Sequence, residues 1–338
     1  METNPGRGFG LYRAQLIDLY PRLGDLLARA ETAFGRAWED QPGFLDQAAR
    51  EVLSGRGKRL RPALLLLAAD CAGGATESSI AMASIVEIVH VASLIHDDVI
   101  DDAPSRHGRR SAKDQWGNKV SVLLGDYLIA GAFSILPRDD GNRLIAGISR
   151  VAATMCSGQI GELRAAGKRM TEEEYLGIVL AKTGSLFSYC CEVGVQTAGG
   201  NGALQDALAR FGESFGIAFQ LADDILDLVG TNGQSGKSEG RDVAERKWTL
   251  PLIHAYNRGD ERVRQRLSQM LMTTGPTPDD IAAAREMARS TGAIDYSWSQ
   301  ADEWLARARQ HLATVPDSPA KQALLALAGD RFPMPVMT

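Results

Sequence analysis

Two runs of aspartates, each preceded by a long apolar stretch, are the part of this chain whose residue types and spacing indicate chemistry most directly. The candidate metal ligands in these runs are Asp97, Asp98, Asp101, Asp223, Asp224 and Asp227. In a helix, the first and last aspartate of each run lie one turn apart on the same face. Carboxylates in apolar surroundings are forced to become neutral unless cations compensate them. Two such faces across a cavity would bind divalent metal.

The ligand type indicates which metal this would be. The chain has no set of histidines and cysteines at the spacing of a zinc site, whereas carboxylates alone suit a hard cation such as Mg²⁺. Mg²⁺ keeps several waters and usually links protein carboxylates to substrate phosphates. A single aspartate run could equally be a solvated helix end, but two runs on two apolar helices favour a metal site. The second ligand would then be a phosphate ester.

Basic residues at several places fit a phosphate ligand. Residues 57–62 place three cations just before an apolar helical run, where free backbone N–H groups also favour anions. Residues 106–110 form an arginine-rich loop directly after the first aspartate run. Lys182 interrupts another apolar helix, and Lys237 and Lys247 flank a glycine-rich segment. A solvated charge is the ordinary alternative for each residue alone, and it fits Lys182 least well.

Composition and charge exclude several classes of protein. With 338 residues, of which 44% are hydrophobic, the chain can build one large core. A formal net charge of -5 argues against a nucleic-acid-binding protein, which needs a basic face. The four cysteines lack metal-site spacing, so we expect buried, reduced thiols. We find neither a signal sequence nor a stretch of about 18 uninterrupted apolar residues, and therefore expect a soluble, cytoplasmic protein without transmembrane segments.

The elements that must position these residues are helices. Apolar residues recur at helical spacing along the chain, without the alternation that is typical of strands. Residues 79–102 are apolar nearly all round, which predicts a central helix covered by its neighbours. A second central helix is predicted over residues 203–229, where phenylalanines form a stripe and glycines allow close packing. It should end at Gly230.

The remaining segments complete a simple organisation. Residues 230–247 are polar and rich in glycine, which predicts a mobile loop. We expect flexible ends over residues 1–10 and 331–338. No repeat or low-complexity linker divides the chain, so we predict one all-α domain over residues 1–338.

With its motifs laid out, the chain closely resembles the trans-isoprenyl diphosphate synthases, also called polyprenyl synthetases. The resemblance covers about residues 57–251 and is weaker at both ends. The motifs that carry it, in order along the chain, are Gly57-Lys58-Arg59-Leu60-Arg61-Pro62, Asp97 to Asp101, Trp116-Gly117-Asn118, Gly125-Asp126-Tyr127, Lys182-Thr183, Phe219 to Asp227, Gly236-Lys237, Gly240, Asp242 and Lys247-Trp248-Thr249-Leu250-Pro251. The resemblance implies an all-α bundle of the isoprenoid synthase type with a deep central cavity, usually assembled as a homodimer.

The resemblance also implies a reaction and the residues that perform it. The reaction is the Mg²⁺-dependent, head-to-tail condensation of isopentenyl diphosphate with an allylic diphosphate. The implied ligands, for three Mg²⁺ ions with substrate bound, are Asp97, Asp101 and Asp223, supported by Asp98, Asp224 and Asp227. Residues that match positions holding the allylic diphosphate are Arg106, Lys182, Thr183, Gln220, Lys237 and Lys247, of which Arg106 and Lys182 are counted as catalytic. The isopentenyl diphosphate site corresponds to Lys58, Arg61, His90 and His107.

Two positions depart from the pattern of the family. His107 stands where a second arginine usually follows Arg106 and contacts isopentenyl diphosphate. A histidine is only partly charged near neutral pH, so this contact would become pH-sensitive or pass to Arg109. Arg246 replaces the usual glycine before the second loop lysine and adds a charge there. Neither change touches the metal ligands.

The helix before Asp97 bears on the length of the product. Short-chain members of the family carry a bulky aromatic residue four or five positions before the first aspartate, where this chain has Ser93 and Ala92. Each helical turn of about 5.4 Å accommodates roughly one isoprene unit, so the growing tail could pass Val89 and reach residues 85–86. We predict a long-chain product of roughly six or more units, which an Ala92→Phe change should shorten. The alternative is that residues 128–133 close the tunnel earlier.

Three other functions stay open at this point. A shorter-chain geranylgeranyl or farnesyl diphosphate synthase would share all the motifs. A class I terpene cyclase shares the helical cavity and one aspartate run, but it generally lacks a second all-aspartate run and the element at residues 57–62. A partner subunit of a heteromeric synthase tends to lose metal aspartates, whereas this chain keeps all six.

Overall fold

The computed structural model describes residues 16–36, 43–54, 59–106, 109–136, 141–230, 240–272 and 275–329. Over these residues the chain is all-α, as predicted, apart from one hairpin in which β1 (Ser105–Arg106) pairs with β2 (Arg109–Arg110). The first helices are α2 (Arg22–Arg36), α3 (Phe44–Leu53), α4 (Leu60–Cys71), α5 (Glu77–Ile100), α6 (Ala112–Trp116), α7 (Asn118–Ser134) and α8 (Gly141–Ala165). Then follow α9 (Glu172–Val179), the π-helix η1 (Leu180–Gly184), α10 (Ser185–Thr197), α11 (Gly202–Val229), α12 (Arg241–Ala244), α13 (Leu250–Arg258), α14 (Glu261–Met272), α15 (Pro278–Ser290), α16 (Ala293–His311), the 3₁₀ helix η2 (Leu312–Thr314) and α17 (Pro319–Leu327).

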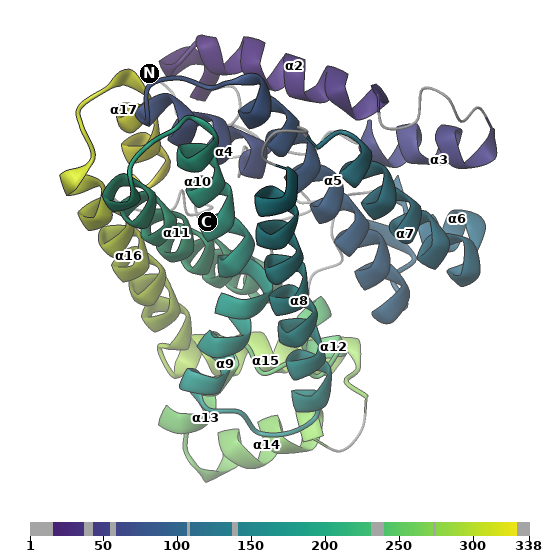
Figure 1. Cartoon of the computed structure of the whole chain (residues 1–338). Coiled ribbons are helices and arrows are strands. Elements are labelled where there is room, and N and C mark those ends of the chain that lie inside the picture. The colour runs from purple at the N-terminus through teal and green to yellow at the C-terminus, as the bar shows by residue number, and fades with distance from the viewer. Residues whose placement is uncertain are drawn as a thin grey trace.

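The helix α10 lies at the centre of the fold. It packs against α4, α5, α8 and α11, and α11 packs in turn against α16. Figure 1 shows α2 across the top of the view, α6 and α7 on the right, α16 and α17 on the left, and α13 and α14 at the bottom. Because α10 contacts both α5 and α11, it stands between the two helices that carry the aspartate runs.

Both predicted central helices are confirmed, with small shifts at their ends. The helix α5 begins at Glu77 because Thr76 and Ser79 form a capping box. It ends at Ile100, two residues before the predicted end, and Asp102 adopts a left-handed backbone conformation with φ 51°. The helix α11 stops before Gly230, whose φ of 82° suits glycine. Asp101 therefore lies in the turn directly after α5 and not inside the helix.

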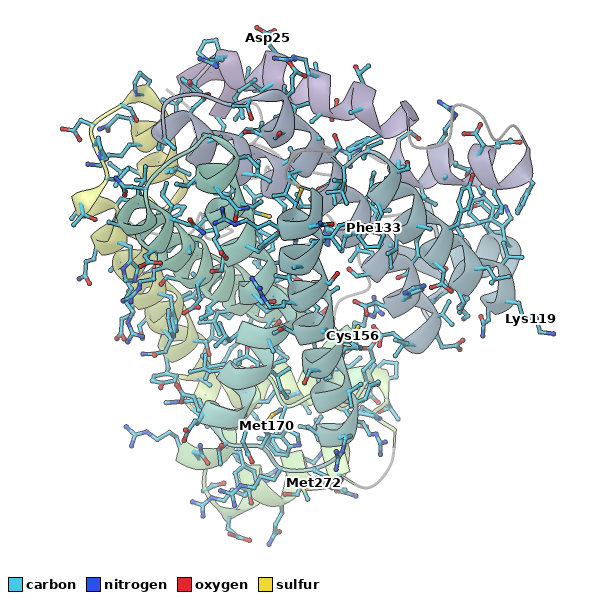
Figure 2. All side chains as sticks on the ribbon, viewed as in Figure 1. Asp25, Lys119, Phe133, Cys156, Met170 and Met272 are labelled. Atoms are coloured by element: carbon cyan, nitrogen blue, oxygen red, sulfur yellow. The ribbon has the colours of Figure 1, made fainter. Side chains whose placement is uncertain are left out.

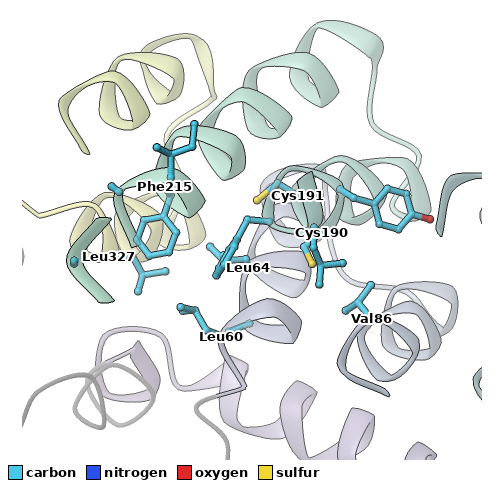
Figure 3. Packing of buried hydrophobic residues seen from close by; sticks show 14 of the residues in the cluster. Leu60, Leu64, Val86, Cys190, Cys191, Phe215 and Leu327 are labelled. Atoms are coloured by element: carbon cyan, nitrogen blue, oxygen red, sulfur yellow. The ribbon is translucent and has the colours of Figure 1, made fainter. Parts of the chain in front are cut away.

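The glycines of α11 let this helix approach α10 closely, as the sequence predicts. A Cβ atom on Gly216 would lie 2.9 Å from the Cβ of Phe187, so any larger residue would force the helices apart. Phe187 of α10 also makes an edge-to-face contact with Phe215 of α11. Figure 3 shows the surrounding core, where Leu64 of α4, Cys190 and Cys191 of α10 and Phe215 lie close together.

One expectation about the cysteines is wrong. Cys71, Cys190 and Cys191 are buried free thiols, but Cys156 is exposed on α8. In Figure 2 its side chain lies on the near face of this helix. Cys156 shares one side of α8 with the exposed apolar residues Ile160 and Leu163. Sequence alone does not distinguish such a side from a core-facing one.

In the part of the chain that the structure describes, two helical stretches are long and apolar enough to cross a membrane by length and composition, Glu77–Ile100 and Glu172–Thr197. The apolar windows of these stretches are 67% and 61% buried inside the fold. Their hydropathy is therefore explained by their places in the core, which both helices share with α4.

The predicted mobile loop of residues 230–247 is partly wrong. Its last residues include the short helix α12, and the backbone N–H of Gly240 donates to the Asp227 carbonyl oxygen at 2.9 Å. Residues 231–239 lie outside the described residues, as do the predicted flexible ends. The hydrogen bonds of residues 240–242 tie α12 to α11, and glycine content alone does not reveal such contacts.

Candidate active site

The first aspartate run lies at the end of α5. Asp97 and Asp98 occupy the last helical turn, and the backbone N–H of Asp101 donates to the Asp97 carbonyl oxygen at 2.8 Å. The Asp101 side chain is only 10% exposed, and its Oδ2 accepts a 2.9 Å bond from Arg241 Nη2. Burial raises the pKa of Asp101, whereas the positive charges of Lys247 and Arg241 act to lower it. Asp102, by contrast, points outward and pairs with Lys113.

The second aspartate run is held in a different way. Asp224 is buried, and its two carboxylate oxygens accept hydrogen bonds from Tyr175 Oη at 2.6 Å and Gln220 Nε2 at 2.7 Å. Burial raises the pKa of Asp224 to about 7, although both hydrogen bonds act to lower it. Asp227 accepts backbone N–H bonds from Arg241 at 3.3 Å and Asp242 at 3.0 Å. These contacts of Asp224 and Asp227 come from neutral donors, which orient the two carboxylates.

The two predicted active-site residues of the π-helix η1 point to different partners. Lys182 Nζ donates to Glu162 Oε2 at 2.7 Å, and Thr183 Oγ1 donates to Gln220 Oε1 at 2.9 Å. The helix α8 runs close beside this segment, since a Cβ atom on Gly158 would lie 2.7 Å from the Lys182 backbone nitrogen. A π-helical turn is rare and often marks a functional site. The sequence showed the lysine but not this local geometry.

Glu162 of α8 is a site residue that sequence reasoning missed. Its carboxylate lies 2.7 Å from Lys182 Nζ and 3.4 Å from Lys247 Nζ. Burial acts to raise the pKa of Glu162, but the two ammonium groups outweigh this effect and lower it. Lys247 also lies 2.6 Å from Glu245. Glu162 thus brings together two lysines that are far apart in the sequence, and the signal was an acidic residue within an otherwise weakly charged helix.

Gln159, one turn before Glu162 on α8, is a second missed residue. Its side chain is 9% exposed, and neither its amide oxygen nor its amide nitrogen has a hydrogen-bond partner within the described structure. A buried amide without partners costs about 1–3 kcal/mol, so such a group is expected to meet a ligand or water. It lies on the same face of α8 as Glu162.

The predicted isopentenyl diphosphate site is described only in part. Arg61 Nη1 lies 2.9 Å from His90 Nε2, and the guanidinium group stacks over the Phe187 ring with its carbon 4.5 Å from the centroid. The structure therefore brings Arg61 and His90 together. Lys58, His107 and Lys237 lie outside the described residues, as does the side chain of Arg106. Arg59, also in this motif, has a structural role, since it forms a buried 2.7 Å ion pair with Glu87.

The three predicted chain-length residues do not share one face of α5. Ser93 is on the stripe of Asp97 and His90, which leads away from the aspartates along the helix. Ala92 is fully buried and falls on the stripe of His96. His96 faces α7, because its Nε2 lies 3.1 Å from the Val122 carbonyl oxygen. Ala92 is thus directed toward α7. Val89, one turn further along, is also buried and lies between the two stripes.

The residues of the site fit Mg²⁺ bound together with a diphosphate. Among the residues that the structure describes, no three histidine, cysteine or acidic side chains converge on one point. Mg²⁺ commonly binds through one or two carboxylates plus substrate phosphates and water, so it does not need such a cage. The raised pKa values of Asp101 and Asp224 arise mainly from burial. They show carboxylates that would gain from a cation, and a guanidinium group already lies against Asp101.

Comparison with known proteins identifies the family of this chain. The family model for polyprenyl synthetases matches residues 42–288. The heptaprenyl diphosphate synthase component 2 of Geobacillus stearothermophilus is 34% identical over 93% of this chain and 97% of its own. The decaprenyl diphosphate synthase structure from Rhodobacter capsulatus superposes with a TM-score of 0.87 at 33% identity, covering 94% of this chain and 97% of that one.

A further solved structure bears on the ligands. The polyprenyl synthase of Caulobacter crescentus, solved as a complex with calcium and isoprenyl diphosphate, superposes with a TM-score of 0.86 at 30% identity. It covers 97% of this chain and 98% of its own. The family match and these relatives show that the chain belongs to the polyprenyl synthetase family.

Proposed function

We propose that this prenyltransferase condenses isopentenyl diphosphate with an allylic diphosphate, in a Mg²⁺-dependent, head-to-tail elongation that ends at a long-chain product. The observation that carries the proposal is the joining of both aspartate runs by α12, through Asp101 on one side and Asp227 on the other. Lys247 lies near Asp101, and Glu162 brings it together with Lys182 of η1. Two aspartate runs with these ammonium groups nearby suit a metal-bound diphosphate between them. We also propose that the protein is soluble and located in the cytoplasm.

The roles of individual residues follow from this arrangement. Asp97 and Asp101 would hold Mg²⁺ from the α5 side and Asp223 from the α11 side, with Asp98, Asp224 and Asp227 in support. When bound, Mg²⁺ neutralises the charge of the leaving diphosphate. Lys182 and Lys247 place ammonium groups near one point, held there by Glu162 until a diphosphate replaces this carboxylate as their partner. Thr183 and Gln220 form a hydrogen-bonded pair that keeps the α11 carboxylates in orientation.

The chemical steps then need few further groups. The allylic C–O bond ionises and leaves pyrophosphate. The double bond of isopentenyl diphosphate attacks the allylic cation and forms the new C–C bond, and the departing pyrophosphate accepts the proton that is lost from the adjacent carbon. Preorganised cations in a site that excludes water supply most of the stabilisation of the leaving group. Arg61 and His90 would hold the diphosphate of isopentenyl diphosphate.

Two observations support a long product. Two of the relatives described above are named heptaprenyl and decaprenyl diphosphate synthases. On this chain, the stripe of α5 below Asp97 carries only the small Ser93 at the first turn, so no aromatic side chain stands there as a floor. We propose about six or more isoprene units, at roughly one unit per helical turn.

Product analysis tests the proposal. The purified chain should incorporate labelled isopentenyl diphosphate onto farnesyl diphosphate only when Mg²⁺ is present, and chromatography should show products of about six or more units by turn counting along α5. A main product of three or four units would contradict the long-chain part. Release of a hydrocarbon from the allylic substrate alone would indicate a terpene cyclase.

A heteromeric enzyme is the second candidate, and the name of one relative favours it. That relative is called component 2 of a heptaprenyl diphosphate synthase and matches 93% of this chain. If the chain needs a partner, the purified protein alone should bind substrates but form no elongated product. Condensation by the purified chain would exclude this requirement.

We also propose a homodimer, supported by an exposed apolar face. The large hydrophobic side chains that α7 and α8 leave exposed are Val122, Leu123, Phe133, Ile145, Ile160 and Leu163. Phe133 of α7 and Cys156 of α8 both lie on the near side of the molecule in Figure 2. Exposed apolar side chains that form one large patch usually mark an interface. Light scattering should give twice the mass of the chain, and Ile160→Lys should shift it to the monomer.

A further inference from the structure

Arg241 contacts both aspartate runs. Its guanidinium Nη2 donates to Asp101 Oδ2 at 2.9 Å, and its backbone N–H donates to Asp227 Oδ1 at 3.3 Å. The same guanidinium uses Nε to bind Glu245 at 2.5 Å. Glu245 in turn contacts Lys247 at 2.6 Å. The guanidinium group is thus anchored at one end by Glu245 and lies against a proposed metal ligand at the other.

The contact with Asp101 has the character of a replaceable ion pair. Arg241 is 26% exposed and Asp101 is 10% exposed, so the pair is shielded from water without being sealed off. A guanidinium group stays charged at any ordinary pH and matches the geometry of carboxylates and phosphates equally well. Mg²⁺ prefers oxygen ligands, and in proteins one or two of these are usually carboxylates. An ion that approaches Asp101 therefore meets a cation that already neutralises it.

We propose that Arg241 is the resident cation of the first aspartate run, which holds Asp101 before metal binds, gives it up to Mg²⁺, and then donates to the diphosphate that arrives with the metal. The inference rests on the proposed function, because it takes Asp101 as a metal ligand. Its consequence is an order of events. Metal alone should bind poorly, whereas metal together with diphosphate should bind well, since the diphosphate offers the displaced guanidinium a new partner.

Arg241→Gln should strengthen the binding of metal alone and weaken the binding of diphosphate together with metal. Without diphosphate, the variant should bind Mn²⁺ roughly three- to tenfold more tightly, because the ion no longer competes with a partly buried ion pair. With inorganic pyrophosphate and Mn²⁺ together, the variant should bind pyrophosphate several-fold more weakly, because one charged donor is missing. If Arg241 had only a structural role, the variant would bind both Mn²⁺ alone and pyrophosphate with Mn²⁺ more weakly than wild type.

The experiment is an electron paramagnetic resonance titration of free Mn²⁺, with and without pyrophosphate, on wild type, Arg241→Gln and Arg241→Lys. Arg266→Gln is the matched control, because Arg266 makes a comparable ion pair with Asp280 between α14 and α15. It should match wild type in both titrations. Arg241→Lys keeps the charge and should lie between wild type and Arg241→Gln. If circular dichroism shows that Arg241→Gln does not fold, the comparison of Arg241→Lys with wild type still tests the inference.

The outcomes separate the two proposals. If wild type binds no Mn²⁺ even with pyrophosphate, the proposed metal site at the aspartates is wrong. If wild type binds Mn²⁺ with pyrophosphate and the folded Arg241 variants show the same affinities as wild type, the role of Arg241 is wrong while the proposed function stands. Weaker binding of both ligands by the variants would also overturn the inference.

Discussion

The two aspartate runs do similar chemistry in the proposed reaction, but the fold prepares them differently. In the run after α5, the carboxylate of Asp101 lies against the guanidinium cation of Arg241. In the run on α11, Asp224 accepts hydrogen bonds from the neutral groups of Tyr175 and Gln220, and Asp227 accepts them from backbone N–H groups.

The difference shows that a carboxylate can be oriented without having its charge neutralised. Hydroxyl, amide and backbone donors fix the direction of a carboxylate but add no positive charge, so the attraction for a metal ion persists. A guanidinium group both fixes and neutralises its partner. Asp224 is therefore oriented by these contacts without being neutralised by them, whereas Asp101 becomes available to metal only after Arg241 leaves it.

Removal of a metal ligand should give the largest effect and should be alike in both runs. Asp97→Asn and Asp223→Asn should each lower kcat by at least about 10²–10³-fold, since either change removes charge stabilisation of the leaving group. Steady-state assays at saturating Mg²⁺ measure this. Asp102→Asn is the matched control, because this neighbouring side chain points outward to Lys113. Full activity of Asp223→Asn would show that the α11 run holds no metal.

A smaller effect should come from the neutral donors of the α11 run. Tyr175→Phe removes the 2.6 Å hydrogen bond to Asp224 and should lower kcat/KM by about 10–100-fold, as loss of an orienting partner does at metal sites. Tyr189→Phe is the control, since Tyr189 is a buried tyrosine whose hydroxyl donates to the Leu144 carbonyl oxygen instead. Equal losses of activity in both variants would mean that only packing matters.

The buried carboxyl of Asp224 should make the stability of the metal-free protein fall as the pH rises. Its pKa is raised from 3.8 to about 7 by burial, so the folded protein binds this proton more tightly than the unfolded chain does. The unfolding free energy then decreases between about pH 4 and 7, by about 1–3 kcal/mol. Urea unfolding in EDTA should show this decrease in wild type but not in Asp224→Asn. Parallel pH profiles of the two proteins would contradict the assignment.

The smallest effect on rate, but a clear effect on product, should come from the helix below the α5 run. Ser93→Phe places an aromatic ring on the stripe of Asp97 and should shorten the main product by about one or more units, at roughly one unit per turn. Ala92→Phe must act through α7, so it should also cost stability by overpacking, about 1–3 kcal/mol. Chromatography of the products and thermal unfolding measure the two effects. A full-length product from Ser93→Phe would place the tunnel elsewhere.

Much of the fold and half of the site could be predicted from the sequence, for physical reasons. The apolar periodicity of residues 79–102 and 203–229 reports burial directly, and both central helices form within two residues of the predicted bounds. Motif order predicts the aspartates and Lys182 as candidate site residues. The exposed face of Cys156 could not be foreseen, because an apolar face toward solvent has the same pattern as one toward the core.

Contacts between distant segments account for what the sequence did not reveal. Glu162, Gln159 and Arg241 belong to no metal-type spacing. Glu162 pairs with Lys182, 20 positions away, and Arg241 pairs with Asp101, 140 positions away. The π-helical turn around Lys182 depends on the packing of α8 against it and not on local propensity. Such residues become visible only when the helices are assembled.

The most direct test of the account is a crystal structure with Mg²⁺, isopentenyl diphosphate and a non-ionisable thio analogue of the allylic diphosphate. The account predicts one diphosphate between the two runs, with metal ions ligated by Asp97 and Asp101 on the α5 side and by Asp223 on the α11 side. Arg241 should have left Asp101 and should donate to the diphosphate. A diphosphate bound away from either run, with the Arg241–Asp101 pair intact, would contradict it.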